Sequence, residues 1–541
     1  MVQPTQPWPS FKSSLYALGS NTPLTRCGHF QEYYNDKSVI TEYQNVVERL
    51  LLTLSDDDDV LKKDVPVLLS NEESQVWPPW PWPPWGEDDQ DKDGGDKKPV
   101  NHTLRAHQLA KKVVKLEKKL AKASLDLDIL YEDPIATYNP HPLSNLTDAL
   151  PQIDFPAYFS SFTPRTFPRV VIITYPAYAH SLREILDDTS PSVLEAYLVV
   201  RAALSLAPHL GMSTEAWQAQ RTLRELLTGI KKGAIGDRSE YCIGKVEESL
   251  GFAVGRYFVN ETFSGESRAQ GTKVITDIVN SFKASLPHVQ WLDKKSADAA
   301  AEKAEAIRVK VGYPTSPDTK NSRSIAQYYA GVKVDSVNFF ENVISAAKSA
   351  IFKKWLQLGR RRDSNTWEMY PSMVNAYFNP PANEEGKLEE WWTNSTSEGF
   401  QIKQDCIVKQ YSEYTIDDGK GGKIHVNGNL TSGENIGDTG LIQAYRAWKD
   451  QYDASYKADK EFVLPGLPFT REQLFFISFA RIWARAMKPA AAVQRIRTDP
   501  HSPSRYRVDG TVSNIPEFAK AFKCSKNAKL NPPVEVQCRF W

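Results

Sequence analysis

The amino-acid sequence predicts a mainly α-helical protein with small β elements. Residues 36–54 and 104–129 carry apolar side chains at spacings of three and four, the period of a helix with one buried face. Strand-like runs are short and few, at Val170–Thr174 and around Ile424–Val426. Because the helical patterns are much longer than the strand-like ones, we expect helix packing to supply most of the core.

The first two expected helices each have a clear apolar face. Residues 36–54 place Val39, Tyr43, Val46, Val47 and Leu50 on one side. Residues 104–129 place lysines opposite an apolar stripe, which is typical of a solvent-exposed helix face and not of a nucleic-acid patch. That stripe consists of Leu109, Val113, Leu116, Leu120, Ala123 and Leu127.

Further helices are expected within residues 190–310. One of them should begin at Ser296 as N-cap, run to Val311 and end at Gly312-Tyr313-Pro314. Between the early helices, WPPWPWPPW is followed by GEDDQDKDGGDKK, which neither continues a helix nor buries a core. We interpret residues 71–100 as a surface insertion; a polyproline ligand for a partner groove is the alternative.

Composition excludes some classes of function. The chain has 66 basic and 66 acidic residues among its 541, so no global field favours nucleic acid or an anionic membrane. The most apolar helix candidate, Val193–Ala207, is too short to span a bilayer and carries two charges. Five cysteines without a CxxC pair do not make a small disulfide scaffold. We expect no nucleic-acid partner and no membrane segment in this chain.

Five N-x-[ST] sequons, typical of a secreted glycoprotein, lack a matching export signal. They lie at Asn101, Asn145, Asn260, Asn394 and Asn429. The N-terminus has no basic region followed by an apolar stretch, so it is not a signal peptide. The expectation is that the true start of the protein is missing from this sequence, which leaves its localisation open.

An acidic pair marks the C-terminal third. Glu434 and Asp438 lie four apart in SGENIGDTG, so on a helix they share one face. The simpler interpretation is a solvent-facing acidic pair. The alternative is a metal ligand together with a carboxylate that orients a ligating histidine.

Three further segments flank this pair in a particular order and favour the second interpretation. They are VNAYFNP (374–380), RTDPHSPSRYRVDGT (497–511) and the terminal CRFW (538–541). The order and the residues of these segments resemble those of peptidase family M13, the neprilysin and endothelin-converting enzyme type. Members of that family are zinc endopeptidases that cut peptides and small proteins. Agreement extends over residues 31–541, through GFAVGRYFVNETFSGESR, KLEEWWT and LPGLPFTREQLFFISFARIW, and is greatest with fungal secreted members.

The resemblance implies roles for four residues around a zinc ion. Glu434 matches the third zinc ligand and Asp438 the carboxylate behind the metal site. His501 matches the imidazole that stabilises the tetrahedral oxyanion, and Asp499 matches its orienting partner. Such fixed donors, aimed where negative charge develops, lower the barrier to hydrolysis.

Other roles implied by the resemblance concern the substrate and the cysteines. Asn375 and Ala376 match the pair that hydrogen-bonds the substrate main chain like an added strand, and Arg507 matches the guanidinium that holds the substrate carbonyl. Cys406 and Cys538 match a family disulfide. The partners of three further cysteines stay open: Cys27, Cys242 and Cys524.

The same resemblance divides the chain and predicts its architecture. We expect an atypical segment at 1–30, a helical domain at 31–315, connecting helices at 316–370, and a catalytic-type domain at 371–541. The implied fold is a two-lobed ectodomain with a thermolysin-like (gluzincin) catalytic lobe that is incomplete here. Members of the family are secreted or membrane-anchored ectodomains.

The zinc-binding motif of the family is absent. Zinc peptidases of this type need H-E-x-x-H, with two imidazoles on the metal and a Glu as general base. None of the nine histidines has a second one four residues away, and none is followed by Glu. A block of several dozen residues is missing between Asn383 and Gly386, where NAYFNPPANE runs straight into EGKLEEWWT. We expect neither tight zinc binding nor zinc-dependent proteolysis.

Three hypotheses account for this combination. The chain is an alternatively spliced or incompletely predicted product of an M13 gene, which the clean edges of the deletion favour. Alternatively, it is a pseudopeptidase that binds peptides or regulates an active homologue. A hydrolase that uses another site has little support, since no GxSxG occurs and no cysteine sits beside a histidine.

Overall fold

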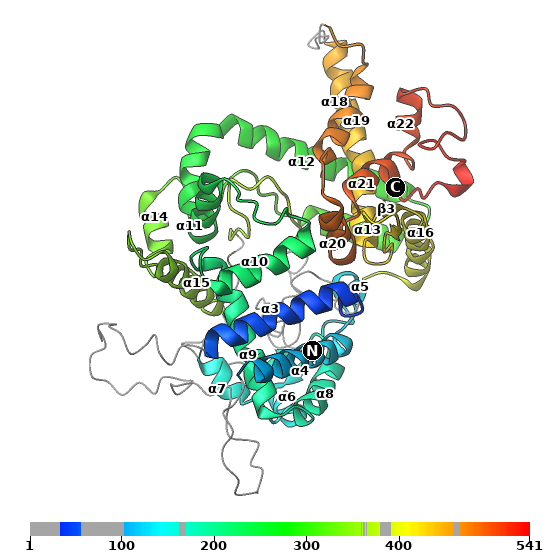
Figure 1. Ribbon diagram of the computed structural model, residues 1–541. Helices are drawn as coiled ribbons and strands as arrows, with labels where there is room; N and C mark the ends of the chain where they lie inside the picture. The colour runs from blue at the N-terminus through cyan, green and yellow to red at the C-terminus, as the bar shows by residue number, and fades with distance from the viewer. Residues whose placement is uncertain are drawn as a thin grey trace, which may run out of the picture.

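The computed structural model describes residues 33–55, 102–161, 169–263, 265–358, 360, 363, 365–378, 391–458 and 466–541. The expected N-terminal segment 1–30 and the insertion 71–100 lie outside these residues. Within them the chain is mainly α-helical with two small sheets, as the sequence predicts. Two groups of helices form two lobes. Helix α12 (Gly265–Ser285) reaches from one lobe to the other, where it packs against α18 (Leu441–Lys457) (Figure 1).

The helices before residue 310 supply most of the first lobe. They are α3 (Lys37–Ser55), α4 (His102–Ala123), α5 (Leu127–Glu132), α6 (Leu143–Ala149), α7 (Phe155–Ser160), α8 (Pro176–Asp187), α9 (Pro191–Leu206), α10 (Glu215–Thr228), α11 (Arg238–Thr262), α12 (Gly265–Ser285) and α13 (Lys294–Glu305), with the 3-10 turns η1 (Ala207–His209) and η2 (Leu286–His288).

Of the helices before residue 310, α13 lies in the second lobe, where the Thr393 backbone N–H donates to its Ser296 hydroxyl (Figure 1). The helices after residue 320 run first along α11, where two of them pack, and then form the second lobe. They are α14 (Ser322–Tyr328), α15 (Phe339–Trp355), α16 (Asn394–Ser412), α17 (Ser432–Thr439), α18 (Leu441–Lys457), α19 (Arg471–Trp483), α20 (Pro489–Thr498), α21 (Ser504–Val512) and α22 (Pro516–Ala521), with the 3-10 turn η4 (Val534–Val536).

Helix α3 confirms the prediction for residues 36–54 to within one residue at each end. All five side chains assigned to its apolar face are buried, with exposures from 0% to 7%. They pack against α4 and α10 in the largest hydrophobic cluster among the described residues. Glu117 of α4 lies inside this cluster, where Tyr34 and Tyr43 each donate a hydrogen bond of 2.9 Å to its carboxylate.

The prediction of a single helix at 104–129 is wrong, because α4 ends at Ala123 and a second helix, α5, begins at Leu127. The Ser124 hydroxyl donates to the Leu120 carbonyl, and Asp126 adopts an extended backbone as the N-cap of α5. The apolar stripe runs across the break, since Leu127 is as buried as Leu120, at 5% exposure each. Periodicity therefore could not reveal the bend, which redirects α5 toward the second lobe.

The helix expected at 296–311 is also shifted. Helix α13 begins at Lys294, and its N-cap is Asp293, whose carboxylate accepts from the Ser296 backbone N–H at 2.9 Å. Ser296 is instead a fully buried residue of the first turn, whose hydroxyl accepts from the Thr393 backbone N–H. The helix ends at Glu305, several residues before the Gly-Tyr-Pro stop.

Both expected β segments are confirmed as strands of two-stranded antiparallel sheets. Strand β2 (Val170–Ile172) pairs with β1 (Pro140–Pro142), with His141 opposite Val171. Strand β4 (Lys423–His425) pairs with β3 (Thr415–Asp417), with Ile416 opposite Ile424. The second hairpin leads directly into α17.

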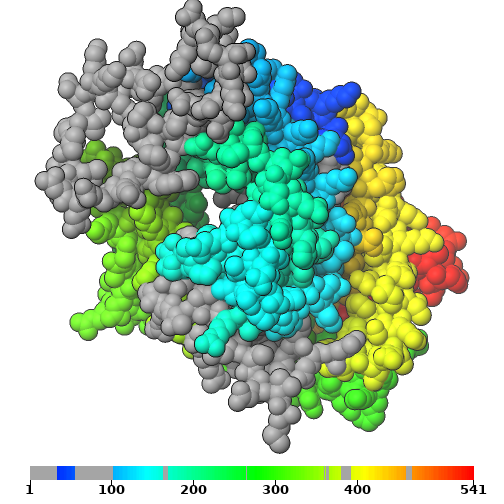
Figure 2. All heavy atoms as spheres, turned by 90° about the horizontal axis from the view of Figure 1, so that it is seen from below, coloured from blue at the N-terminus to red at the C-terminus, as the bar shows by residue number. Residues whose placement is uncertain are grey.

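The two lobes meet along the N-terminal helices. Helix α10 packs against α20, and the Arg497 guanidinium lies over the ring of Tyr33. Seen from below, the blue and cyan N-terminal helices lie between the green residues near 340 and the yellow ones near 400 (Figure 2). Among the described residues no single helix is long and apolar enough to cross a membrane; α8 and the segment Pro191–His209, bent by 119°, pass that test only when taken together.

Candidate functional site

Helix α17 carries the predicted acidic pair. The sequence SGENIGDT forms two turns, so Glu434 and Asp438 lie on the same side of the helix. Asn435, fully buried between them, donates to the Thr431 hydroxyl at 2.9 Å and accepts from the Ser502 hydroxyl at 2.8 Å. The second bond ties α17 to the loop that carries His501.

His501 lies between two carboxylates. Its Nδ1 is 2.6 Å from Asp499 Oδ1, and its Nε2 is 3.2 Å from Glu434 Oε2. The hydrogen bond to Asp499, followed by that to Glu434, raises the pKa of His501 to about 9, against the effect of burial. At neutral pH both ring nitrogens therefore carry protons and donate to these carboxylates.

The two carboxylates respond in the same direction. The hydrogen bond from His501 lowers the pKa of Glu434, although partial burial opposes the shift. For Asp499, burial favours the neutral form, but hydrogen bonds from the His501 side chain and backbone, with the charge of Arg495, lower its pKa to about 2. Arg495 also forms an ion pair with Asp499 along α20. Near neutral pH, Asp499 therefore forms ion pairs with His501 and Arg495, and Glu434 forms one with His501.

Arg507 binds Asp438 through two parallel hydrogen bonds. Its Nε lies 2.7 Å from Oδ2 and its Nη2 lies 2.6 Å from Oδ1, the bidentate geometry that is strongest between these groups. The guanidinium stacks on the Trp483 ring at 3.9 Å, and the two charged side chains are only 12% and 9% exposed. Burial raises the pKa of Asp438, and the hydrogen bonds from Arg507 oppose that rise.

The cluster balances its own charge. Three carboxylates face three cationic groups, so opposite charges are equal in number without any added ion. Its members are Glu434, Asp438, Asp499, His501, Arg495 and Arg507.

A catalytic zinc requires three protein ligands. Glu434 and His501 are paired with each other at 3.2 Å, and their side chains are 44% and 37% exposed. Both oxygens of Asp438 are bound to Arg507. Within the described part of the chain, no group of three His, Cys, Asp or Glu side chains could hold a metal ion.

The residues assigned to substrate binding are only partly brought together. Arg507 lies in the cluster, but no hydrogen bond or ion pair between described residues joins Asn375 or Ala376 to it. Both are exposed in an irregular stretch, and the Ala376 N–H donates to the Asn375 side chain at 2.8 Å. The preceding residues Tyr370 and Pro371 pack against glycines of α11, in the first lobe.

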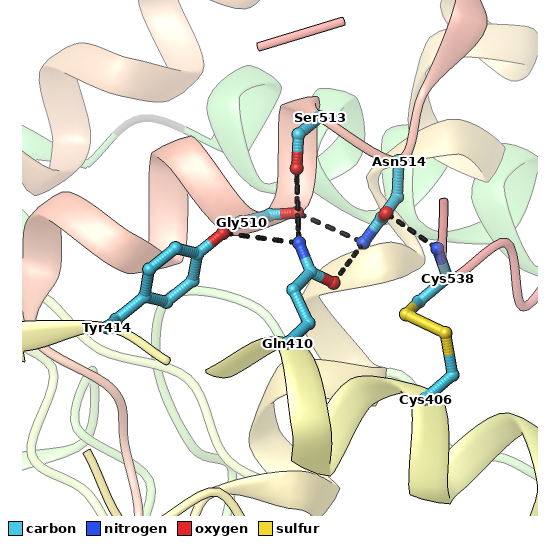
Figure 3. The surroundings of a disulfide bond; sticks show 7 residues. All are labelled: Cys406, Gln410, Tyr414, Gly510, Ser513, Asn514 and Cys538. Atoms are coloured by element: carbon cyan, nitrogen blue, oxygen red, sulfur yellow. Dashed lines mark hydrogen bonds between the residues drawn. A yellow bond between two sulfur atoms is a disulfide. The ribbon is translucent and has the colours of Figure 1, made fainter. Parts of the chain in front are cut away.

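A disulfide joins α16 to the C-terminal segment of the chain. Cys406 of α16 is bonded to Cys538, with their Cα atoms 5.5 Å apart (Figure 3). Next to it, Gln410 donates to the Gly510 carbonyl and the Ser513 hydroxyl, at 3.2 and 3.1 Å. Asn514 in turn accepts from the Cys538 backbone N–H at 2.8 Å. This network fixes α16 against the end of α21, which carries Arg507. Cys242 and Cys524 are free thiols.

Several residues of the site were not predicted from the sequence. Arg495, Trp483 and Asn435 complete the cluster, and only Arg495 gave a usable signal, since it lies four residues before Asp499 at the end of a helix. Trp483 comes from α19, and its contact with Arg507 depends on tertiary packing alone.

Comparison with known families decides the assignment. Two models described as peptidase family M13 match the chain, the N-terminal one over residues 28–314 and the second over residues 376–538. The chain belongs to peptidase family M13. The resemblance expected from the C-terminal segments is thus confirmed and covers both halves.

Curated relatives of this M13 member agree. It is 28% identical to an endothelin-converting enzyme homolog of Locusta migratoria, over 83% of this chain and 66% of that one. It is 30% identical to human endothelin-converting enzyme 1, over 69% and 52%, and 30% identical to mouse neprilysin, over 80% and 64%. The chain therefore spans between about half and two thirds of the length of these relatives.

Solved structures show the same fold. A zinc metalloprotease of Mycobacterium tuberculosis, solved with an inhibitor, superimposes with a TM-score of 0.75 at 21% identity, covering 97% of this chain and 77% of that one. The PepO protein of a Lactobacillus superimposes with a TM-score of 0.67 at 22% identity, covering 81% and 72%. The M13 chain thus has the neprilysin-like fold predicted for it.

Proposed function

We propose that this chain is an M13 family member that does not hydrolyse peptide bonds by the zinc-activated water of its family. The observation that carries the proposal is the sequence itself, which lacks H-E-x-x-H and with it two zinc ligands and the general base. Without the metal no bound water reaches a pKa near neutrality, and without the Glu no group takes its proton.

The geometry of the cluster supports the proposal. His501 donates to Glu434, and Arg507 donates to Asp438 from two nitrogens. The Arg507–Asp438 pair is largely buried, so breaking it carries a substantial free-energy cost. Asp438 and Arg507 are therefore held by each other, and the more exposed Glu434 and His501 are paired as well.

A cleavage assay tests the proposal. The purified chain is incubated with zinc and a mixture of fluorogenic peptides, next to human endothelin-converting enzyme 1 as the H-E-x-x-H control. We expect no cleavage above the rate of a heat-treated sample. Chelator-sensitive cleavage by the purified chain would overturn the proposal.

We further propose that the deletion arose by splicing or gene prediction. The genomic DNA between the codons for Asn383 and Gly386 is then expected to encode an H-E-x-x-H segment. A chain with that segment restored should bind zinc and cleave the same peptides. If the DNA contains no such segment, this origin is wrong. A secreted glycoprotein history belongs to the same proposal, and the sequon asparagines that the structure describes are all exposed: Asn145, Asn260, Asn394 and Asn429.

Peptide binding without hydrolysis is the second candidate. It is favoured by the exposed irregular stretch before residue 379, in which Val374 is 102% exposed and the backbone makes no strand pairing among the described residues. An exposed stretch outside a sheet can accept a peptide as an added strand when its backbone is extended. The occupant proposed is an extended peptide segment of a peptide or small protein.

Fluorescence anisotropy of a labelled peptide mixture, in the absence of zinc, tests the second candidate. Asn375→Ala removes one amide and should weaken binding by about fivefold, as the loss of one hydrogen bond does. Asn145→Ala, an exposed asparagine of α6, serves as the matched control. No saturable binding, or equal binding by both variants, would count against this function.

A further inference from the structure

The first turn of α17 receives its cap from a distant helix. Thr431, its own N-cap residue, makes no side-chain cap, because its hydroxyl donates to the Asn427 carbonyl at 3.0 Å. Glu132, the last residue of α5 in the other lobe, fills the position. Its carboxyl group lies 3.4 Å from the Ser432 hydroxyl and against the Gly433 backbone. Burial raises the pKa of Glu132 to about 7, although the hydrogen-bonding groups of Gly433 and Ser432 oppose the rise. A carboxyl group at a helix N-terminus can accept from free N–H groups, and its ionised form opposes the helix dipole.

Gly433 is the residue that allows this close approach. A Cβ atom added there would overlap the Glu132 carboxylate. Its neighbour Gly437, one turn further along the same helix, would meet nothing within 4 Å. The steric requirement for glycine in this helix is therefore confined to the point where α5 arrives.

Helix α5 also faces the other half of the cluster. The pKa of the Tyr131 hydroxyl is raised by partial burial, although the residue is 55% exposed, and next by the negative charge of Asp499. The neighbouring residues Tyr131 and Glu132 thus interact with Asp499 and with α17 respectively. The break at Ser124–Asp126 makes this possible, since a continuous α4 would carry the chain in another direction.

We propose that Glu132 is a positioning residue, which fixes the first turn of α17 from the opposite lobe and so holds Glu434 against His501. The orientation of the acidic pair then depends on the packing of the two lobes, and not on the second lobe alone. This inference does not rest on the proposed function, because it holds whether or not the chain binds or cleaves a peptide.

Hydrogen exchange measured by mass spectrometry on the full chain tests the inference. Glu132→Ala should accelerate exchange in the peptide that covers residues 431–436 by roughly fivefold to thirtyfold, as expected for the loss of a helix cap. Glu132→Gln keeps one acceptor oxygen and should restore most of the protection. Glu184→Ala, an exposed residue of α8, is the matched control and should leave these residues unchanged.

A second pair of variants keeps the test decisive if Glu132→Ala folds poorly. Gly433→Ala should accelerate exchange at 431–436 in the wild-type background, because its methyl group meets Glu132. In the Glu132→Ala background the same change should have no such effect. Equal effects of Gly433→Ala in both backgrounds, or an acceleration by Glu132→Ala that is uniform over the whole chain, would overturn the proposal.

Discussion

The disulfide between Cys406 and Cys538 offers the sharpest test of how the second lobe is held together. Replacing both cysteines by alanine removes the bond but leaves the contacts around it. Asn514 still accepts from the backbone N–H of residue 538, and the Trp291 indole still donates to the Phe540 carbonyl at 2.9 Å. We therefore expect the folded structure to persist and the effect to act through the unfolded chain.

The size of the effect follows from the loop that the bond closes. The two cysteines are 132 residues apart. In the chain-entropy model, closing a loop of this length lowers the conformational entropy of the unfolded chain and so raises its free energy by about 5 kcal/mol at 25 °C. Engineered and native bonds often contribute less, so a loss of roughly 2 to 5 kcal/mol is expected. Such a loss is a large part of the ~5–15 kcal/mol that stabilises a typical domain.

Urea unfolding followed by far-UV circular dichroism measures this loss. The matched control replaces the two free thiols, Cys242 and Cys524, by alanine, and should change the free energy of unfolding by less than about 1 kcal/mol. Reduction of the wild-type chain should reproduce the loss seen in the Cys406→Ala/Cys538→Ala variant. If that variant loses no more than the control, the chain-entropy reasoning is refuted.

Three further outcomes are expected. Burial raises the pKa of Glu117 to about 7 from its usual 4.5. Between pH 4.5 and pH 7 folding therefore takes up a proton, so the free energy of unfolding of the wild type should fall by roughly 3 kcal/mol as pH rises through this range. Glu117→Gln should lack this fall in a pH series of urea titrations; an equal fall in both chains would contradict it. Arg507→Met leaves Asp438 buried without its partner and should cost about 3–5 kcal/mol of unfolding free energy, whereas the double variant with Asp438→Leu should recover most of that loss; no recovery would show that the pair is not the cause. In thermal melts Gly428→Ala should destabilise the chain because its Cβ would overlap a backbone carbonyl of α16, while Gly244→Ala, with open space around it in α11, should stabilise it by about 0.5–1 kcal/mol.

Parts of the candidate site were predictable because they rest on short-range geometry. A spacing of four places Glu434 and Asp438 on one face of any helix, and a spacing of two allows Asp499 to reach both the backbone and the ring of His501. The partner of Arg507 was not predictable in this way. Its guanidinium joins α17 to α21 across 69 residues of sequence, and the Trp483 ring that it stacks on comes from a third helix.

The sequence by itself determined the family, the helical class, the position of strands β2 and β4 and the absence of H-E-x-x-H, since each of these is written in local order and spacing. Only the tertiary structure decided where α4 ends, which residue caps α13 and which caps α17. Apolar periodicity continues through a bend when both segments bury the same face, as Leu120 and Leu127 do. A cap supplied from 300 residues away, such as Glu132 on Ser432, leaves no local pattern, because its partner is chosen by the packing of two lobes.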